Sequence, residues 1–193
     1  MTRVPSTMPP LGMLAPSFSL PDTEGGIVSL EDLADAPAVL VAFICNHCPF
    51  VIHIRQGFAE FGREFGDRGV AIIAINSNDV DRYPGDSPEA MALEHERAGY
   101  TFPYLFDESQ DVAHAYRAAC TPDLYLFDAD RRLVYRGEFD GSRPGNTVPV
   151  TGASLRAAVE AVLDGRVPDP DQRPSVGCNI KWKPGNEPEW FGA

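Results

Sequence analysis

Two continuous apolar segments constrain the fold of this chain most strongly. Residues 38–44 (AVLVAFI) and 70–75 (VAIIAI) are each of strand length and carry no charged side chain. Such segments are typical of strands that are buried on both faces of a sheet. Between them, apolar side chains recur at steps of three and four, which predicts a helix that ends near Gly66. These side chains are Val51, Ile54, Phe58, Phe61 and Phe65. Strand, helix and strand together predict a βαβ unit with a parallel strand pair and a right-handed crossover.

The remaining elements extend this unit into an α/β fold with a mixed central sheet flanked by helices. Residues 18–20 and 27–30 flank a PDTEGG turn, which predicts an N-terminal β-hairpin. The Ser87-Pro88-Glu89 sequence is typical of a helix start, and this helix should run to about Ala98. The other expected elements are a short strand at 102–106, a helix from Ser109 to about Ala118, an antiparallel hairpin of strands at 123–127 and 133–139, and a helix at 153–163.

The C-terminal part of the chain differs from the rest in composition. From Arg166 onward it is rich in proline and lacks periodicity, yet it carries Trp182 and Trp190. Two large apolar side chains are uncommon in a disordered segment. We therefore expect one α/β domain over residues 1–165, with its core at about 12–165, and an ordered tail over residues 166–193 that packs on it.

Charge and hydropathy argue against several classes of partner. The formal net charge is −12, and the two lysines, Lys181 and Lys183, both lie in the tail, so a surface that binds nucleic acid is not expected. The longest apolar run, residues 36–44, is far shorter than the roughly 20 residues that span a membrane. The N-terminus has no apolar run long enough for a signal peptide. We therefore expect no nucleic-acid partner, no membrane association and a cytoplasmic location.

A Cys-x-x-Cys motif lies at the junction between the first buried strand and the helix. Cytoplasmic thiols are mostly kept reduced, so such a motif there is more often catalytic or metal-binding than structural. Cys45 directly follows the strand, where unpaired N–H groups and the helix dipole should stabilise a thiolate. Cys48, one turn further on, should be the more buried thiol and should resolve a mixed disulfide on Cys45. Asn46 and His47 lie between them and should tune the dithiol, His47 by its positive charge when protonated.

The same segment also contains possible metal ligands. Cys45, His47, Cys48 and His53 are residue types that bind zinc or copper. Zinc needs four converging ligands, and His53 lies five residues beyond Cys48, well around the predicted helix. A metal site therefore ranks below a redox dithiol, and we expect neither a metal nor an organic cofactor.

The order of the elements resembles that of the thioredoxin superfamily over about residues 12–165. The motifs that carry the resemblance are strand–CNHC–helix, Thr121-Pro122-Asp123 before a strand, and the opening GMLAPSFSL at residues 12–20. The CNHCP motif, the helix at 87–98 and the C-terminal GCNIKWK segment resemble the peroxiredoxin-like (AhpC/TSA and cytochrome-maturation thioredoxin-related) branch. The resemblance implies a cis peptide bond before Pro122 that faces the dithiol. It also implies that Thr121 and Pro122 bind an extended substrate.

The resemblance implies a thiol-disulfide oxidoreductase that acts on protein or small-molecule disulfides. A thioredoxin or glutathione system would then return it to the reduced state. The alternative is a peroxiredoxin-type thiol peroxidase with an antioxidant role and a peroxide substrate, and a copper or zinc carrier is the third possibility. Peroxiredoxins carry Thr three residues before the reactive cysteine and Pro seven before it, where this chain has Ala42 and Ala38. This departure favours disulfide exchange over peroxide reduction.

Two further cysteines are candidates for extra redox thiols. Cys120 lies two residues before Pro122 and should lie close to the dithiol, although a small buried apolar role fits it equally well. Cys178 lies within five residues of both lysines, which would lower its pKa if they stay close. In the simpler interpretation the lysines only keep the tail soluble. The sharper hypothesis is that the tail folds back over the dithiol and that Cys178 acts as an additional resolving thiol, paired with Cys120.

Overall fold

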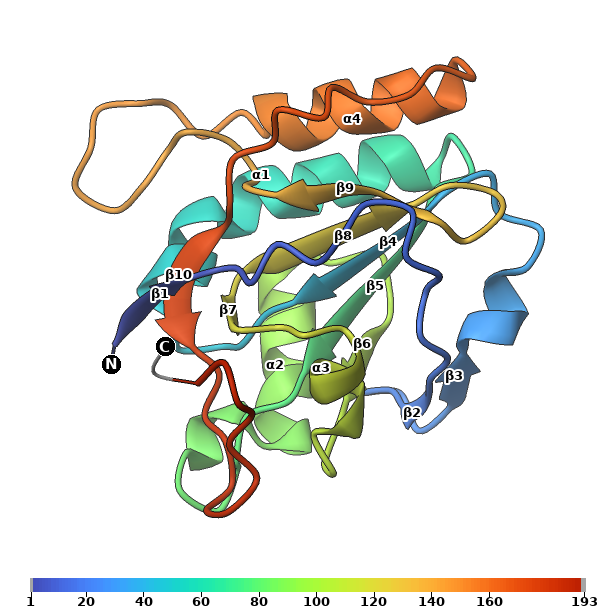
Figure 1. The fold of residues 1–193 in the computed structure, drawn as a ribbon. Helices are drawn as coiled ribbons and strands as arrows, with labels where there is room; N and C mark the ends of the chain where they lie inside the picture. Colours follow the sequence, from blue (N-terminus) through green and yellow to red (C-terminus); the bar gives the residue numbers. More distant parts are fainter. Residues whose placement is uncertain (1, 192–193) are drawn as a thin grey trace.

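A computed structural model describes residues 2–191 and places a five-stranded mixed sheet at the centre of the protein (Figure 1). Its strands, in spatial order, are β6 (Tyr104–Phe106), β5 (Ala71–Asn76), β4 (Val39–Phe43), β8 (Asp123–Phe127) and β9 (Leu133–Gly137). Strands β4, β5 and β6 pair in parallel, whereas β8 is antiparallel to both β4 and β9. The predicted parallel pair and the predicted antiparallel hairpin are thus confirmed within one sheet.

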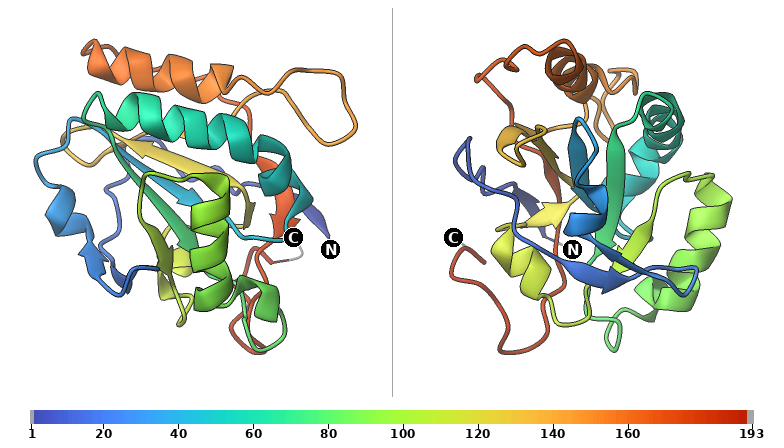
Figure 2. Two further views of the ribbon diagram at one scale, coloured as in Figure 1. Left: turned by 180° about the vertical axis from the view of Figure 1, so that it is seen from behind. Right: turned by 90° about the vertical axis from the view of Figure 1, so that its right-hand side faces the viewer.

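Helices cover this sheet on both faces. They are α1 (Pro49–Gly66), α2 (Pro88–Ala98), α3 (Asp111–Ala115) and α4 (Ala153–Leu163), with short 3-10 helices η1 (Leu30–Leu33) and η2 (Pro84–Asp86). Helices α1 and α4 lie side by side over one face (Figure 2). Side chains alternate along a strand, so Leu40 and Ala42 of β4 pack in the cluster that contains α1 and α4. Val41 and Phe43 pack on the other face, with α3 and the tail. Burial on both faces explains the unbroken apolar sequence of β4.

Helix α1 is positioned by its apolar face. All five side chains that defined its period in the sequence are buried in the structure. Each buried side chain of this size stabilises the fold by about 1.5–3 kcal/mol relative to an exposed one. Their aromatic rings pack together, with Phe58 and Phe61 both contacting Phe139 edge-on. The first turn of α1 is therefore held firmly at the carboxyl edge of β4.

Two short sheets complete the fold. Strands β2 (Ser19–Pro21) and β3 (Ile27–Ser29) form the predicted hairpin. The second sheet has the order β1 (Arg3–Pro5), β10 (Val176–Asn179) and β7 (Cys120–Thr121). Figure 1 shows β1 and β10 side by side. The sequence predicted an ordered tail, but it did not predict that this tail contributes a strand.

Some predicted boundaries differ from the structure around α3. The helix expected from Ser109 to about Ala118 extends only over Asp111–Ala115. Asp107, rather than Ser109, supplies the side chain that accepts the amides of Val112 and Ala113, at 3.4 and 2.9 Å. The short strand expected at 102–106 begins at Tyr104, and the strand expected to reach 139 ends at Gly137.

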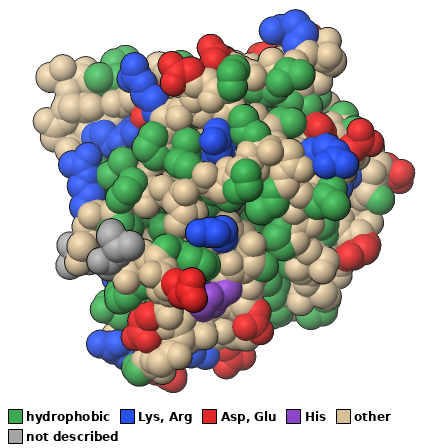
Figure 3. Space-filling model, viewed as in Figure 1, with side chains coloured by type: hydrophobic (Ala, Val, Ile, Leu, Met, Phe, Trp, Pro, Cys, Tyr) green, Lys and Arg blue, Asp and Glu red, His purple; other side chains and the backbone are tan. Residues whose placement is uncertain are grey.

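The surface carries charges of both signs. On the face shown in Figure 3, basic, acidic and hydrophobic side chains are interspersed. Among residues 2–191, no helix combines the length and the apolar character that crossing a membrane requires.

Candidate redox site

The two cysteines of the motif lie where β4 ends and α1 begins. Cys48 is the N-cap residue of α1, with Pro49 in the first helical position, and Cys45 lies in the short connection before it. Cys48 is fully buried, and Cys45 exposes 2% of its surface. None of the four cysteines, all within the described range, takes part in a disulfide.

The segment before β8 brings Thr121 against both thiols. Its hydroxyl Oγ1 lies 3.4 Å from Cys45 Sγ, and Cys48 in its thiol form donates a hydrogen bond of 3.1 Å to its carbonyl oxygen. The Thr121–Pro122 peptide bond is cis, as the resemblance implied. The fold thus brings together two motifs that lie far apart in the sequence.

The tail brings a third thiol to this point. Strand β10 pairs antiparallel with β7, so that Cys178 lies opposite Thr121 and Asn179 lies opposite Cys120. Directly opposed residues of an antiparallel pair share one face of the sheet, and neighbours along a strand alternate. Cys178 therefore lies on the face of Thr121 and of the dithiol, where its thiol hydrogen-bonds with Cys48.

Cys120 is separated from this cluster by strand alternation. It is fully buried, and its Sγ lies 3.5 Å from the carbonyl oxygen of Pro122. Burial raises the pKa of the Cys120 thiol well above its ordinary value. The geometry therefore favours Cys48, rather than Cys120, as the thiol that Cys178 meets.

The hydrogen bonds of the cluster favour negative charge on Cys48. Hydrogen bonds from Cys178 and Cys45 lower the pKa of Cys48 far below its usual range, and the backbone N–H of Val51 in α1 adds to this effect. The hydrogen bond to Cys48 raises the pKa of Cys45, as do burial and the charge of Asp86. The sequence placed the thiolate on Cys45, whereas these hydrogen bonds favour it on Cys48. The cap position of Cys48, at the unpaired N–H groups of α1, adds to their effect.

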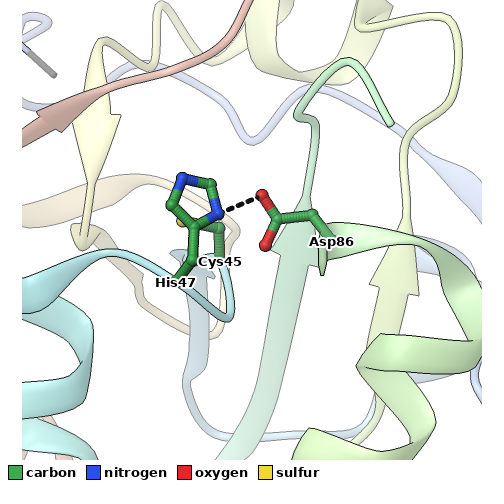
Figure 4. A group of neighbouring side chains, drawn as sticks. All are labelled: Cys45, His47 and Asp86. Atoms are coloured by element: carbon green, nitrogen blue, oxygen red, sulfur yellow. Dashed lines mark ion pairs between the residues drawn. The ribbon is translucent and has the colours of Figure 1, made fainter. Parts of the chain in front are cut away.

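A buried carboxylate fixes the two residues between the cysteines. Asp86 of η2 is fully buried and lies 2.7 Å from Nδ1 of His47 (Figure 4). It also accepts the backbone N–H of Asn46 at 2.9 Å and the side-chain amide of Asn78 at 2.8 Å. Asp86 was not among the residues expected from the sequence, because it lies in a short 3-10 helix far along the chain from the motif. The sequence holds one indication of this contact, because β5 ends in polar residues. The side-chain amide of Asn76 there donates to the backbone carbonyl of Asp86 at 2.8 Å.

Aromatic side chains enclose the same loop. The hydroxyl of Tyr104 donates to Asn46 at 3.0 Å. The ring of Tyr83 stacks on His47, with centroids 5.8 Å apart and an interplanar angle of 6°. The ammonium group of Lys181 in the tail lies 5.8 Å from the centre of the Tyr83 ring, a distance typical of a cation–π contact. The tail thus contacts both the dithiol and the residues that surround it.

The metal ligands considered from the sequence do not converge. His53 points elsewhere, since its Nε2 lies 2.7 Å from the hydroxyl of Ser142. A different group, Cys45, His47 and Asp86, has ligand atoms within 4.8 Å of one another. It offers fewer than the four protein ligands of a structural zinc site, and Nδ1 of His47 already pairs with Asp86. We therefore interpret His47 and Asp86 as the electrostatic surroundings of Cys45.

Sequence comparison places these features in a known family. The sequence profile of the AhpC/TSA family matches residues 11–136, well over half of the chain. The chain belongs to the AhpC/TSA family. Among curated relatives, "Putative peroxiredoxin Rv2521" of Mycobacterium tuberculosis (strain ATCC 25618 / H37Rv) is 27% identical over 125 residues, which cover 65% of this chain and 73% of the relative. Thiol-disulfide oxidoreductase ResA of Bacillus subtilis (strain 168) is 28% identical over 123 residues, covering 64% of each protein.

Solved structures extend the similarity to the whole architecture. An uncharacterized conserved protein from Geobacillus kaustophilus is 52% identical, with a TM-score of 0.94 over 96% of this chain and 98% of that one. The thioredoxin domain of a thiol-disulfide oxidoreductase from Bacteroides vulgatus shares the fold at 18% identity, with a TM-score of 0.57 over 76% of this chain and 96% of that one. The AhpC/TSA member described here therefore has a thioredoxin-like fold.

Proposed function

We propose that the protein is a thiol-disulfide oxidoreductase in which Cys45 and Cys48 form the redox dithiol. The observation that carries the proposal is the contact of both thiols with Thr121, beside the cis peptide bond, at the junction of β4 and α1. Two thiols in contact at the start of a helix can form and release a disulfide without a metal or an organic cofactor. The name of the ResA relative supports the same chemistry.

The hydrogen bond between the thiols gives each cysteine a separate role. Cys45 attacks one sulfur of the substrate disulfide and passes its proton to the thiolate of Cys48, and the other substrate sulfur leaves as a thiolate. Cys48 then gives up this proton to a departing thiolate and attacks Cys45 Sγ. The second substrate thiolate leaves, and the protein holds a Cys45–Cys48 disulfide. One disulfide has been reduced and another formed, so the electrons balance.

The cycle closes when an external thiol reductant reduces the Cys45–Cys48 disulfide. A thioredoxin or glutathione system supplies such electrons in the cytoplasm, which is the compartment we propose for this activity. Thr121 and Pro122 line the reacting thiols, and we assign them to substrate positioning. Strand β10 already pairs with Thr121, so an extended substrate meets an occupied edge there.

Peroxide reduction is the second candidate, and one contact favours it. The Thr121 hydroxyl lies 3.4 Å from Cys45 Sγ, and it could take the place of the hydroxyl that Ala42 lacks. The name of the M. tuberculosis relative points in the same direction. Against this candidate, the chain has Ala42 and Ala38 at the positions where peroxiredoxins carry Thr and Pro before the reactive cysteine.

The two candidates make opposite predictions for the reduced protein. Stopped-flow mixing with a small aromatic disulfide should give a fast phase that ends in a Cys45–Cys48 disulfide, and insulin should be reduced under turnover with dithiothreitol. Hydrogen peroxide should oxidise the protein no faster than it oxidises free cysteine. A fast peroxide phase together with negligible disulfide exchange would establish the peroxidase instead.

We predict that Asp86→Asn makes Cys45 more acidic. The negative charge of Asp86 contributes to the raised pKa of Cys45, so its removal should move the pKa downward. The shift should be measured as the pH dependence of Cys45 alkylation by iodoacetamide in a Cys48→Ser/Cys178→Ser background. In this background the other two thiols of the cluster cannot contribute to the titration. The midpoint should move to lower pH.

Asp81→Asn is the matched control for this experiment. Asp81 is an exposed acid a few residues before Asp86, and its amide variant has the same change in formal charge. It should leave the alkylation midpoint in place. An unchanged or higher midpoint in Asp86→Asn would show that the buried carboxylate does not act on Cys45 through its charge.

A further inference from the structure

We propose that Cys178 is a third redox thiol, which takes the disulfide over from Cys45 by exchange at Cys48. This inference rests on the proposed Cys45–Cys48 dithiol and goes beyond it, because it gives the C-terminal strand a chemical role. A dithiol alone holds one disulfide in one place. Three thiols in series, with Cys48 in the middle, can hold the same disulfide in two places.

The placement of Cys178 carries the proposal. Its register opposite Thr121 directs its side chain to the face where Thr121 meets both dithiol sulfurs. The hydrogen bond between Cys178 and Cys48 places the two sulfur atoms in contact. Cys48 therefore contacts a thiol on each side, Cys45 from the loop after β4 and Cys178 from the tail.

Strand β10 is held where this contact requires it. It pairs with β7 on one edge and with β1 on the other, so it is the central strand of its sheet. Gly177 packs so closely on β7 that an added Cβ would lie 1.9 Å from the Thr121 carbonyl oxygen. After the strand, the N–H of Ile180 donates to the carbonyl of Ala119 at 3.0 Å. Cys178 itself is 4% exposed, so it reacts with Cys48 more readily than with a bulky molecule from solution.

The exchange step neither consumes nor supplies electrons. Starting from the Cys45–Cys48 disulfide, Cys178 Sγ attacks Cys48 Sγ, a Cys48–Cys178 bond forms, and the Cys45–Cys48 bond breaks. Cys45 leaves as a thiolate and takes the proton that Cys178 has lost. The protein remains oxidised by two electrons, but Cys45 is again a thiol. An external thiol reductant of the kind already proposed then reduces the Cys48–Cys178 disulfide.

The charge distribution favours this direction once the dithiol is oxidised. In the reduced protein, the hydrogen bond to Cys48 is the main cause of the raised pKa of Cys178, and burial is the second. Cys48 carries no negative charge in a disulfide, so the first cause disappears. The positive charge of Lys181, which lowers the pKa of Cys178, remains. Oxidation of the dithiol thus removes the main cause that keeps Cys178 protonated, and the charge of Lys181 then favours the attacking thiolate.

Disulfide mapping of single variants tests the proposal. Cys45→Ser should form a Cys48–Cys178 disulfide on treatment with diamide, and mass spectrometry of its peptides should detect the link. Cys45→Ser/Cys120→Ala should give the same link, whereas Cys45→Ser/Cys178→Ser should stay reduced. A Cys48–Cys120 link in Cys45→Ser, or no link at a diamide dose that oxidises the wild-type protein, would overturn the proposal.

Alkylation of the oxidised protein tests the exchange itself. Oxidised wild-type protein should incorporate iodoacetamide at Cys45, because exchange restores that thiol. Oxidised Cys178→Ser should incorporate none at Cys45 or Cys48. If Cys45 is protected from iodoacetamide to the same extent in the oxidised wild-type protein and in oxidised Cys178→Ser, the exchange is refuted.

These outcomes separate the inference from the proposed function. If the wild-type protein reduces disulfides but forms only the Cys45–Cys48 bond, the third thiol is refuted and the oxidoreductase stands. If Cys48–Cys178 forms but the reduced protein does not react with disulfides, the proposed function is refuted.

Discussion

Replacing Cys45 with serine is expected to abolish disulfide reduction. Turnover with insulin or a small aromatic disulfide should fall by about 1000-fold or more, because a serine hydroxyl cannot form the mixed disulfide that starts the cycle. Serine is nearly the same size as cysteine. Cys45 lies in the connection between β4 and α1, outside any helix or strand, so the replacement disturbs no regular element. The variant should therefore remain folded, which its thermal unfolding curve will show.

The partner variant should stop the reaction one step later. In Cys48→Ser, Cys45 can still attack, but the intramolecular release is lost, so a covalent adduct with the substrate should accumulate and be visible as a mass increase. Cys120→Ala is the matched control, because this cysteine lies on the other face of β7 from the dithiol, and its turnover should stay close to wild type. Full activity in Cys45→Ser, or substrate adducts on another cysteine, would assign the attacking thiol elsewhere.

Gly177→Ala is expected to have the largest effect on stability. The new methyl group would lie 1.9 and 2.6 Å from the carbonyl oxygen and carbon of Thr121. Both are backbone atoms next to the cis peptide bond, so neither can rotate away as a side chain could. The pairing of β10 with β7 should break, and the free energy of unfolding should fall by about 3 kcal/mol, the upper part of the range for overpacked sites. Denaturant unfolding measures this loss.

Gly66→Ala provides the comparison for this experiment. Gly66 is the last residue of α1, and an added Cβ there meets no atom within 4 Å. Its unfolding free energy should stay within about 1 kcal/mol of wild type, since alanine favours the helix. Gly177→Ala should also alkylate faster at Cys178, because that cysteine is carried on the displaced strand. A Gly177→Ala protein as stable as wild type would mean that β10 can shift without loss.

The central fold could be predicted from sequence because its signals are local and strong. The segments at 38–44 and 70–75 have no polar side chain to place in water, so they can only be interior strands. The five apolar positions of α1 fix which side of that helix faces the sheet. The dithiol could be located for the same reason, since Cys45 and Cys48 lie at a junction that both patterns define.

The C-terminal strand, the buried carboxylate and the charge of the dithiol could not be predicted, because they depend on contacts that leave no local pattern in the sequence. Strands β1 and β10 are short and hold their places through backbone pairing, so no periodicity of side chains marks them. Asp86 acts through a loop that meets the dithiol only in three dimensions. The hydrogen bonds that favour negative charge on Cys48 come from Cys178 and Cys45, and Cys178 reaches the site only through the pairing of β10 with β7.

The pairing of β10 with β7 gives this protein a reactivity that mutations outside the site can change. A partner that offers an extended backbone must compete with the chain's own strand for the edge at Thr121. Its access therefore depends on the free energy of a local opening, in which β10 leaves while the central sheet stays folded. Substitutions in β1, which alter that opening but contact no cysteine of the Cys-x-x-Cys motif, could then select between compact and extended substrates.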